Sequence, residues 1–300
     1  PKVPKQSEGC FLSSPQAIMP LSLASLLQTH RDARALPLIM GIVNVTPDSF
    51  SDGGQFFSPD TAIAHARQLI EDGADILDIG AESTRPYGDA SEVSASDEHA
   101  RLAPVLDAII ALGKPVSIDT MKAEVADWAL TRGAAIANDV WGLQRDPDMA
   151  RVVARHGAPV IVMHNRHDVD PAIDIVAEMK SFFARSVEIA RQAGIAREQI
   201  ALDPGIGFGK TVQQSIEALA RMNELLPLGF PLLIGASRKR FIAHLSPAEP
   251  QQRLGGTIAS HLFAADFGAA IVRVHDVAQT AQAMRVRRAL HLAQRPHAAE

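Results

Sequence analysis

The polar side chains of this protein gather where short apolar runs of its sequence end. Eight such runs occur, and each is followed within a few residues by Asp, Asn, Arg, Lys or His. Asp and Asn together with one Lys suit a flat heterocycle whose edge presents both hydrogen-bond donors and acceptors. Arg with His and hydroxyl groups suits a phosphate-type anion. The first kind comprises Asp78, Asp119, Asn138, Asp203 and Lys239, and the second Ser83, Thr84, Arg85, Arg273 and His275.

Each of these residues also has an ordinary structural explanation. Asp and Asn often cap helices or form turns directly after a strand, and Arg273 and His275 could lie at a solvated helix start. Their joint occurrence at every strand end is what favours a site. A carboxylate in a cleft needs a donor or a cation as its partner, and a ligand with amide and amine groups would supply one.

Two weaker motifs need a separate interpretation. The segment Gly205–Thr211 is glycine-rich like a phosphate loop, but a Walker A motif requires Gly at the position of Pro204, which excludes ATP binding by that motif. We expect its glycines to allow a close approach of the backbone at a strand end. His164 has no second His at helical spacing, so a satisfied structural histidine is favoured over a zinc ligand.

The elements that must position these residues are alternating strands and helices. Short β-branched runs separated by segments of helical periodicity indicate βα units, and eight units predict a (β/α)8 TIM barrel of the α/β class. Helices are expected after Ser58-Pro59, with Ile63, Ala66 and Ile70 on one face, and at 173–193 and 251–267; Gly73 and Gly133 should end helices. The predicted strands are Leu38–Val43, Ile76–Ile79, Val116–Ile118, Ala135–Ala137, Val160–Met163, Ile200–Leu202, Leu232–Ile234 and Ala270–Val272.

Composition and charge exclude several classes of protein. Of the 300 residues, 47% are hydrophobic and 21% charged, which is typical of a globular protein. The net charge of −5 gives no general attraction to nucleic acid or to an anionic membrane, and no run approaches the roughly 20 apolar residues of a membrane span. The single Cys10 fits a reducing cytoplasm. We expect an N-terminal extension (1–36), one barrel domain (37–293) and a short tail (294–300).

Taken together, the motifs resemble those of the dihydropteroate synthase family. The resemblance covers essentially residues 37–290, with Asn165, Tyr87 and Arg240 departing from the common family pattern. The segments that carry it are 41–54 (GIVNVTPDSFSDGG), 78–86 (DIGAESTRP), 117–120 (SIDT), 138–140 (NDV), 163–164 (MH), 203–210 (DPGIGFGK), 237–239 (SRK) and 273–277 (RVHDV).

The resemblance implies a reaction and a role for each site residue. The family joins 7,8-dihydropterin-6-ylmethyl diphosphate to p-aminobenzoate, releasing diphosphate and giving dihydropteroate for folate biosynthesis. Catalysis would then depend on Asp119, Lys239 and Asp203. Asp119, Asn138, Asp203 and Lys239 would hold the pterin, with Asp78, Val140 and Met163 beside it; Asn44 would bind Mg²⁺ with the diphosphate, which Ser83, Arg85, Arg273 and His275 would contact; and Thr84, Pro86, Phe208 and Ser237 would line the p-aminobenzoate pocket.

The resemblance also implies a cytoplasmic homodimer. Two alternatives remain at this stage. A pterin-dependent methyltransferase domain would share the barrel and its pterin contacts but needs no diphosphate site, so Arg85, Arg273 and His275 argue against it. A non-catalytic pterin-binding paralogue would bind the pterin without turnover.

Overall fold

The fold is a closed barrel of eight parallel strands surrounded by helices. The computed structural model describes residues 36–46, 58–82 and 93–294. The strands pair in sequence order and β8 pairs with β1, which confirms the predicted (β/α)8 barrel. The strands are β1 (Leu38–Asn44), β2 (Ile76–Gly80), β3 (Val116–Asp119), β4 (Ile136–Asp139), β5 (Val160–Met163), β6 (Ile200–Asp203), β7 (Leu232–Ile234) and β8 (Ala269–Val274).

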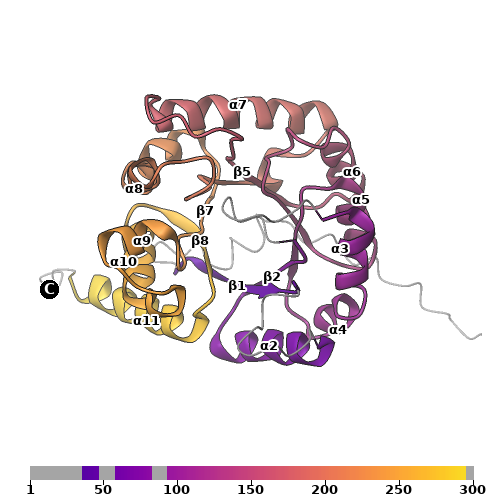
Figure 1. Cartoon of the computed structure of the whole chain (residues 1–300), viewed down its shortest axis with the longest axis horizontal. Coiled ribbons are helices and arrows are strands. Elements are labelled where there is room, and N and C mark those ends of the chain that lie inside the picture. The colour runs from indigo at the N-terminus through magenta and orange to yellow at the C-terminus, as the bar shows by residue number, and fades with distance from the viewer. Residues whose placement is uncertain (1–35, 47–57, 83–92, 295–300) are drawn as a thin grey trace, which may run out of the picture.

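The helices form a ring around the strands (Figure 1). None of those in the described ranges has the length and apolar content that crossing a membrane would require. The α-helices are α2 (Pro59–Asp72), α3 (Ala95–Leu102), α4 (Leu106–Ile110), α5 (Ala123–Thr131), α6 (Met149–His156), α7 (Ile175–Ala193), α8 (Val212–Ala220), α9 (Arg240–Leu245), α10 (Leu254–Asp266) and α11 (Val277–Ala293); short 3-10 turns are η1 (Arg197–Gln199), η2 (Met222–Leu228) and η3 (Pro250–Gln252).

The strands are apolar on both faces because both faces are covered. Residues such as Leu77 and Ile79 belong to the large cluster between strands and helices. Residues of the opposite parity fill the inside of the barrel, as a continuous apolar strand in a parallel sheet should. This interior cluster contains Leu38, Met40, Ile76, Ile136, Ile161, Ala201, Leu233 and Ile271.

Several strands are longer than predicted, because the ladder continues into the polar residues. β5 and β7 have the predicted bounds, but β2, β3 and β6 each extend one residue further, to Gly80, Asp119 and Asp203. Asp119 and Asp203 are therefore held by the strand ladder and not by the loops that follow it.

Some helix details also differ from prediction. Ser58 is the N-cap of α2, but its side chain makes no capping hydrogen bond. The buried face of α2 consists of Ala62, Ala66 and Leu69, whereas Ile63 and Ile70 are only partly buried. Gly73 and Gly133 have φ of 108° and 104° at or just after helix ends, as expected. The helix predicted at 173–193 begins at Ile175 behind an Asp174 N-cap, and the one predicted at 251–267 is divided into η3 and α10.

Candidate active site

Strand alternation places the polar residues inside one end of the barrel. In β2, Ile76 points into the barrel and Leu77 and Ile79 point outward, so Asp78 points inward. The same alternation points Asp119, Asn138, Asp203 and Arg273 inward from β3, β4, β6 and β8. All lie toward the carboxyl ends of their strands, above the apolar interior, which is where barrel enzymes build their active sites.

Arg273 joins two carboxylates in this layer. Its Nε donates to Asp78 at 2.5 Å and its Nη2 donates to Asp119 at 2.7 Å. Asn138 Nδ2 lies 3.3 Å from both carboxylate oxygens of Asp78. Asp78 is fully buried, and these donors satisfy its carboxylate oxygens, which would otherwise be costly to bury. The sequence predicted an anion contact for Arg273, but in this structure its guanidinium is paired with two residues expected beside the pterin.

Asp119 retains one oxygen without a partner. Its Oδ1 is buried and makes no hydrogen bond, while its Oδ2 accepts from Arg273. Burial raises the pKa of Asp119 to about 7, against the opposing effect of the Arg273 cation. An unpartnered buried carboxylate oxygen costs free energy unless a ligand donates to it. The unpartnered Oδ1 of Asp119 therefore indicates a ligand that donates an N–H group to this oxygen.

Asp203 and Lys239 lie on the other side of the same mouth. Asp203 Oδ1 accepts from the backbone N–H of Gly205 at 2.7 Å, and burial raises its pKa. Lys239 Nζ lies 4.1 Å from the centre of the Phe208 ring, within range of a cation–π interaction. Lys239 also lowers the pKa of Asp203 electrostatically, so the two charges act on each other. The structure thus brings together Asp203, Lys239 and Phe208.

Ser237 and His275 form a second polar pair at the ends of β7 and β8. Ser237 Oγ accepts from the backbone N–H of His275 at 3.2 Å and lies 3.0 Å from its Nδ1. Arg238, which directly follows Ser237, has φ of 58°, a left-handed conformation that is unusual for a residue other than glycine. Its guanidinium makes two hydrogen bonds to Asp276 at 3.0 and 2.6 Å. This ion pair links the loops that carry Ser237 and His275.

An apolar surface lines part of the mouth. Val140 and Met163 are buried and pack together with Met121, and Phe208 and Trp141 pack against this cluster. Flat apolar walls with a few polar groups are typical of a site for a small heterocycle.

Asn44 ends β1, and its side chain points to the same side of the strand as Leu38 and Met40, into the barrel. It is only partly buried. Its amide therefore lies at the barrel mouth.

Four of the predicted site residues lie outside the described ranges: Ser83, Thr84, Arg85 and Pro86. The other eleven substrate-binding or catalytic residues, and Asn44, lie at or beside the carboxyl ends of the strands as predicted. The structure shows direct contacts among Asp78, Asp119, Asn138 and Arg273, between Lys239 and Phe208, and between Ser237 and His275.

Sequence reasoning missed two buried ion clusters beside the site. Lys122 Nζ donates to Glu82 at 2.6 Å and to Glu98 at 2.5 Å, and Glu98 also accepts from the Thr120 hydroxyl at 3.0 Å. This cluster fixes the residue that follows Asp119. Its members lie on three separate segments, so spacing along the chain gave no signal for it. The second cluster joins Lys210, His164 and Glu178.

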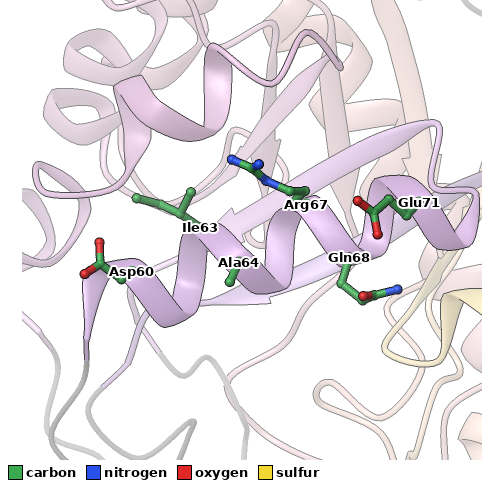
Figure 2. Close-up of a pocket in the computed structure, with 6 residues that line it drawn as sticks. All are labelled: Asp60, Ile63, Ala64, Arg67, Gln68 and Glu71. Atoms are coloured by element: carbon green, nitrogen blue, oxygen red, sulfur yellow. The ribbon is translucent and has the colours of Figure 1, made fainter.

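A surface hollow elsewhere has none of these features. Figure 2 shows the side chains that line it along α2. All the residues that line it come from one helix, and none of them belongs to the polar layer at the ends of the strands. They are Asp60, Ile63, Ala64, Arg67, Gln68 and Glu71. The barrel mouth is the candidate active site.

Comparison with known proteins agrees with this geometry. Residues 40–275 match the family model described as pterin binding enzyme. Dihydropteroate synthase from Bacillus subtilis is 47% identical over 246 residues, which cover 82% of this chain and 85% of the relative. The Escherichia coli dihydropteroate synthase is 43% identical over 257 residues, covering 83% and 90%.

Solved structures give the same result. A dihydropteroate synthase from Clostridium difficile, determined in the presence of pteroic acid, has a TM-score of 0.81 and 47% identity, covering 85% of this chain and 97% of that one. The enzyme from Xanthomonas albilineans with 4-aminobenzoic acid has a TM-score of 0.81 and 44% identity, covering 87% and 94%. The barrel, the polar mouth and these likenesses over most of the sequence establish that the chain belongs to the dihydropteroate synthase family of pterin binding enzymes.

Proposed function

We propose that the chain condenses 7,8-dihydropterin-6-ylmethyl diphosphate with p-aminobenzoate to give dihydropteroate and diphosphate. The observation that carries this proposal is the arrangement around Asp119. A buried carboxylate with one unpartnered oxygen lies among Asn138, Asp78 and Arg273 in a mouth with an apolar wall. Family membership supplies the reaction, and the mouth supplies groups that match both substrates.

The pterin would bind against the inward-facing carboxylates. Its ring N–H and amino groups are donors, which complement Asp119 and Asp203, and the Asn138 amide and the Lys239 ammonium complement its acceptors. Val140 and Met163 provide apolar surface for the ring. Hydrogen bonds from the ligand to Asp119 and Asp203 would stabilise their ionised forms and offset the effect of burial on their pKa values.

The diphosphate would lie at the open side of the mouth. His275 and, from outside the described ranges, Ser83 and Arg85 would contact its oxygens. Arg273 would serve both this group and the carboxylates with which it is paired.

A magnesium ion fits this arrangement only if the substrate supplies most of its ligands. No cluster of three or more His, Cys, Asp or Glu suited to a metal occurs within the described part of the chain. Mg²⁺ commonly keeps several waters and takes one or two protein oxygens together with substrate phosphates. The amide oxygen of Asn44, a partly buried residue, could be such a protein ligand. When bound, the ion would neutralise charge on the departing diphosphate.

The p-aminobenzoate would occupy the pocket beside Phe208 and Ser237, together with Thr84 and Pro86. As the bond from the pterin methylene carbon to the diphosphate oxygen breaks, positive charge develops on the pterin methylene. Asp119 would stabilise that charge electrostatically. The amine nitrogen then forms the new bond to carbon and loses a proton to solvent, so no covalent bond to the protein is needed.

Diphosphate release tests this function directly. Purified protein supplied with dihydropterin diphosphate, p-aminobenzoate and Mg²⁺ should release diphosphate and form dihydropteroate in equal amounts. Asp119→Asn, which preserves the shape of the side chain and removes its charge, should lose most of this rate. Pterin binding without diphosphate release would instead identify a non-catalytic pterin-binding protein or a methyltransferase domain.

We further propose that the chain acts as a cytoplasmic homodimer. Support for the dimer comes from large apolar side chains exposed on α10 and α11. The ring centres of Phe263 and Phe267 lie 4.5 Å apart, and Val286 and Leu290 are more than half exposed. Large apolar side chains exposed on neighbouring helices are a feature of many subunit interfaces. Light scattering should give the mass of two chains, and Phe263→Glu with Leu290→Glu should give the mass of one. A single chain at all concentrations would contradict the proposal.

A further inference from the structure

A fully buried lysine lies behind the glycine-rich loop that follows β6. Lys210 has 1% of its surface exposed, and its Nζ donates to the carbonyl oxygens of Gly205 at 2.9 Å and Phe208 at 3.0 Å. Its third contact is His164 Nδ1 at 2.6 Å. Lys210 has no part in the substrate contacts proposed for the barrel mouth. Burial lowers the pKa of Lys210 to about 7, and its protonated form has one N–H for each of these three contacts.

The contact with His164 extends outward to helix α7. His164 is fully buried, and its Nε2 is hydrogen-bonded to the Glu178 carboxylate. Because a carboxylate only accepts, the proton of the neutral imidazole lies on Nε2, which leaves the Nδ1 lone pair to accept from Lys210. Burial lowers the pKa of His164 to about 4, with Lys210 as the next cause, so the ring stays neutral. We call the hydrogen-bonded set of Lys210, His164 and Glu178 the Lys210 relay.

The relay holds a loop that is already packed tightly by its glycines. Gly205 has φ of 62°, and a Cβ there would lie 2.0 Å from the carbonyl oxygen of His164. A Cβ on Gly209 would lie 2.7 Å from the backbone nitrogen and oxygen of Arg166. The loop after β6 is therefore pressed onto the loop after β5. Lys210 also holds the loop after β6, because its Nζ donates hydrogen bonds to the backbone carbonyl groups of Gly205 and Phe208.

Phe208 connects this loop to the active site. Its ring lies under the Lys239 ammonium at 4.1 Å and packs against the apolar cluster of Met121, Val140 and Met163. A shift of the Phe208 backbone would therefore displace a wall of the mouth and the support of Lys239 together.

We propose that Lys210, His164 and Glu178 are positioning residues for substrate binding, because their hydrogen bonds fix the backbone that carries Phe208 beside Lys239. This inference rests on the function proposed above. Glu178 is the remote end of the relay. It lies on α7, with a quarter of its side chain exposed, and its hydrogen-bonded connection to the active site within the described residues runs through His164 and Lys210.

Glu178 is therefore the residue to change. In Glu178→Ala the buried Nε2–H of His164 loses its acceptor. The imidazole can recover by moving its proton to Nδ1, but that nitrogen then no longer accepts from Lys210. Either outcome weakens the hold on the loop. Other charges near Glu178 are Arg185 at 3.7 Å and Arg166, and the Lys210 ammonium also interacts with Asp203 and Lys239.

The test compares three variants of helix α7 in steady-state diphosphate release. Glu178→Ala should raise KM for one or both substrates about three- to thirtyfold, the range expected for residues that act through a packed network. Its kcat should stay within about twofold, because contacts remote from the reacting atoms contribute equally to the ground and transition states. Glu178→Gln keeps an oxygen acceptor for Nε2–H and should restore most of the loss.

The matched control is Glu188→Ala on the same helix, where the carboxylate contacts only Arg191 and Gln192 and should leave KM unchanged. The proposal is overturned if Glu178→Ala matches this control, or if Glu178→Gln is as impaired as Glu178→Ala. Thermal unfolding of each variant accompanies the kinetics, since loss of stability alone would lower active-enzyme concentration and kcat without moving KM.

Nitrogen-15 NMR of the histidines tests the relay without turnover. The His164 signals, assigned with a His164→Gln variant, should show a neutral Nε2–H tautomer from about pH 5 to about pH 8. They should change in Glu178→Ala. An imidazole that titrates in this range, or that carries its proton on Nδ1, would overturn the relay. Wild-type protein that shows the expected NMR signals but releases no diphosphate would refute the proposed function and leave the hydrogen-bonded relay in place.

Discussion

Replacing Arg273 with Met should destabilise the protein in a way that depends on pH. Met removes both hydrogen bonds and the positive charge while keeping an unbranched side chain of similar length. Two carboxylates, Asp78 and Asp119, then remain in a buried layer without their cation. Breaking a buried pair in this way costs about 3 to 5 kcal/mol, and we expect the lower end because a fifth of the Arg273 side chain is exposed.

The pH dependence comes from Asp119, whose pKa is raised from 3.8 to about 7 in the folded protein. Between these values the folded state binds more protons than the unfolded state, so this group makes stability fall as pH rises toward 7. Above pH 7 its effect in the wild type is constant. Without Arg273 the pKa of Asp119 rises further, so the variant should continue to lose about 1.4 kcal/mol per pH unit above pH 7.

Urea unfolding of the wild type and of Arg273→Met at about pH 7, 8 and 9 measures the difference between their free energies of unfolding. Titrating groups that behave alike in both proteins cancel in this difference. The matched pair is Asp119→Asn with and without Arg273→Met. In that background no titrating carboxylate remains at position 119, so the gap should change less with pH than in the original pair; the remaining change would come from other carboxylates that Arg273 affects, such as Asp203. An equal pH dependence in the two pairs would refute the electrostatic coupling of Arg273 to Asp119.

Three further outcomes are expected. Asp203→Ala and Lys239→Ala should each weaken pterin binding by about 1 to 3 kcal/mol, because each leaves ligand groups unpaired, and calorimetry showing unchanged affinity in both would contradict their roles. The kcat/KM of diphosphate release should increase as pH rises through about 7, because Asp119 must be ionised in the free enzyme; a profile flat from pH 6 to pH 8 would contradict this. Gly205→Ala should lower stability much more than Gly157→Ala, since both have positive φ but only the first places a Cβ 2.0 Å from another backbone atom; thermal unfolding compares them.

The barrel and the residues of its mouth were accessible from the sequence because they depend on local pattern. Eight β-branched runs separated by helical periodicity are sufficient to indicate eight βα units, and parallel strands bring their carboxyl ends to one face. Residues at the ends of those runs, such as Asp119 and Asp203, were therefore identified without knowledge of any contact. The segment of Thr84 and Arg85 falls outside the described ranges, and its predicted role stays a prediction.

Strand bounds were less accurate, because polar residues at the ends were taken for loops. A parallel ladder needs only backbone groups, so Asp119 and Asp203 continue it even though their side chains are polar. The buried face of α2 was predicted in part: Ala66 is buried and Ile63 and Ile70 pack partly buried against the core, but Ala62 and Leu69 are the residues buried beside Ala66. The packing of the whole helix against the barrel decides how far each apolar residue is covered.

What the sequence determined by itself was the fold and the chemical character of the mouth, since periodicity and residue type are properties of short segments. The partners of each charged group were decided by tertiary structure. Arg273 lies 154 residues from Asp119 and 195 from Asp78, yet barrel closure brings β8 near both strands. Lys210, in a segment that suggested only a glycine-rich turn, reaches Glu178 through His164 because the loops after β5 and β6 are pressed together. Electrostatic and hydrogen-bond energies fall off steeply with distance, so these pairings follow from the positions of atoms in space and not from spacing along the chain.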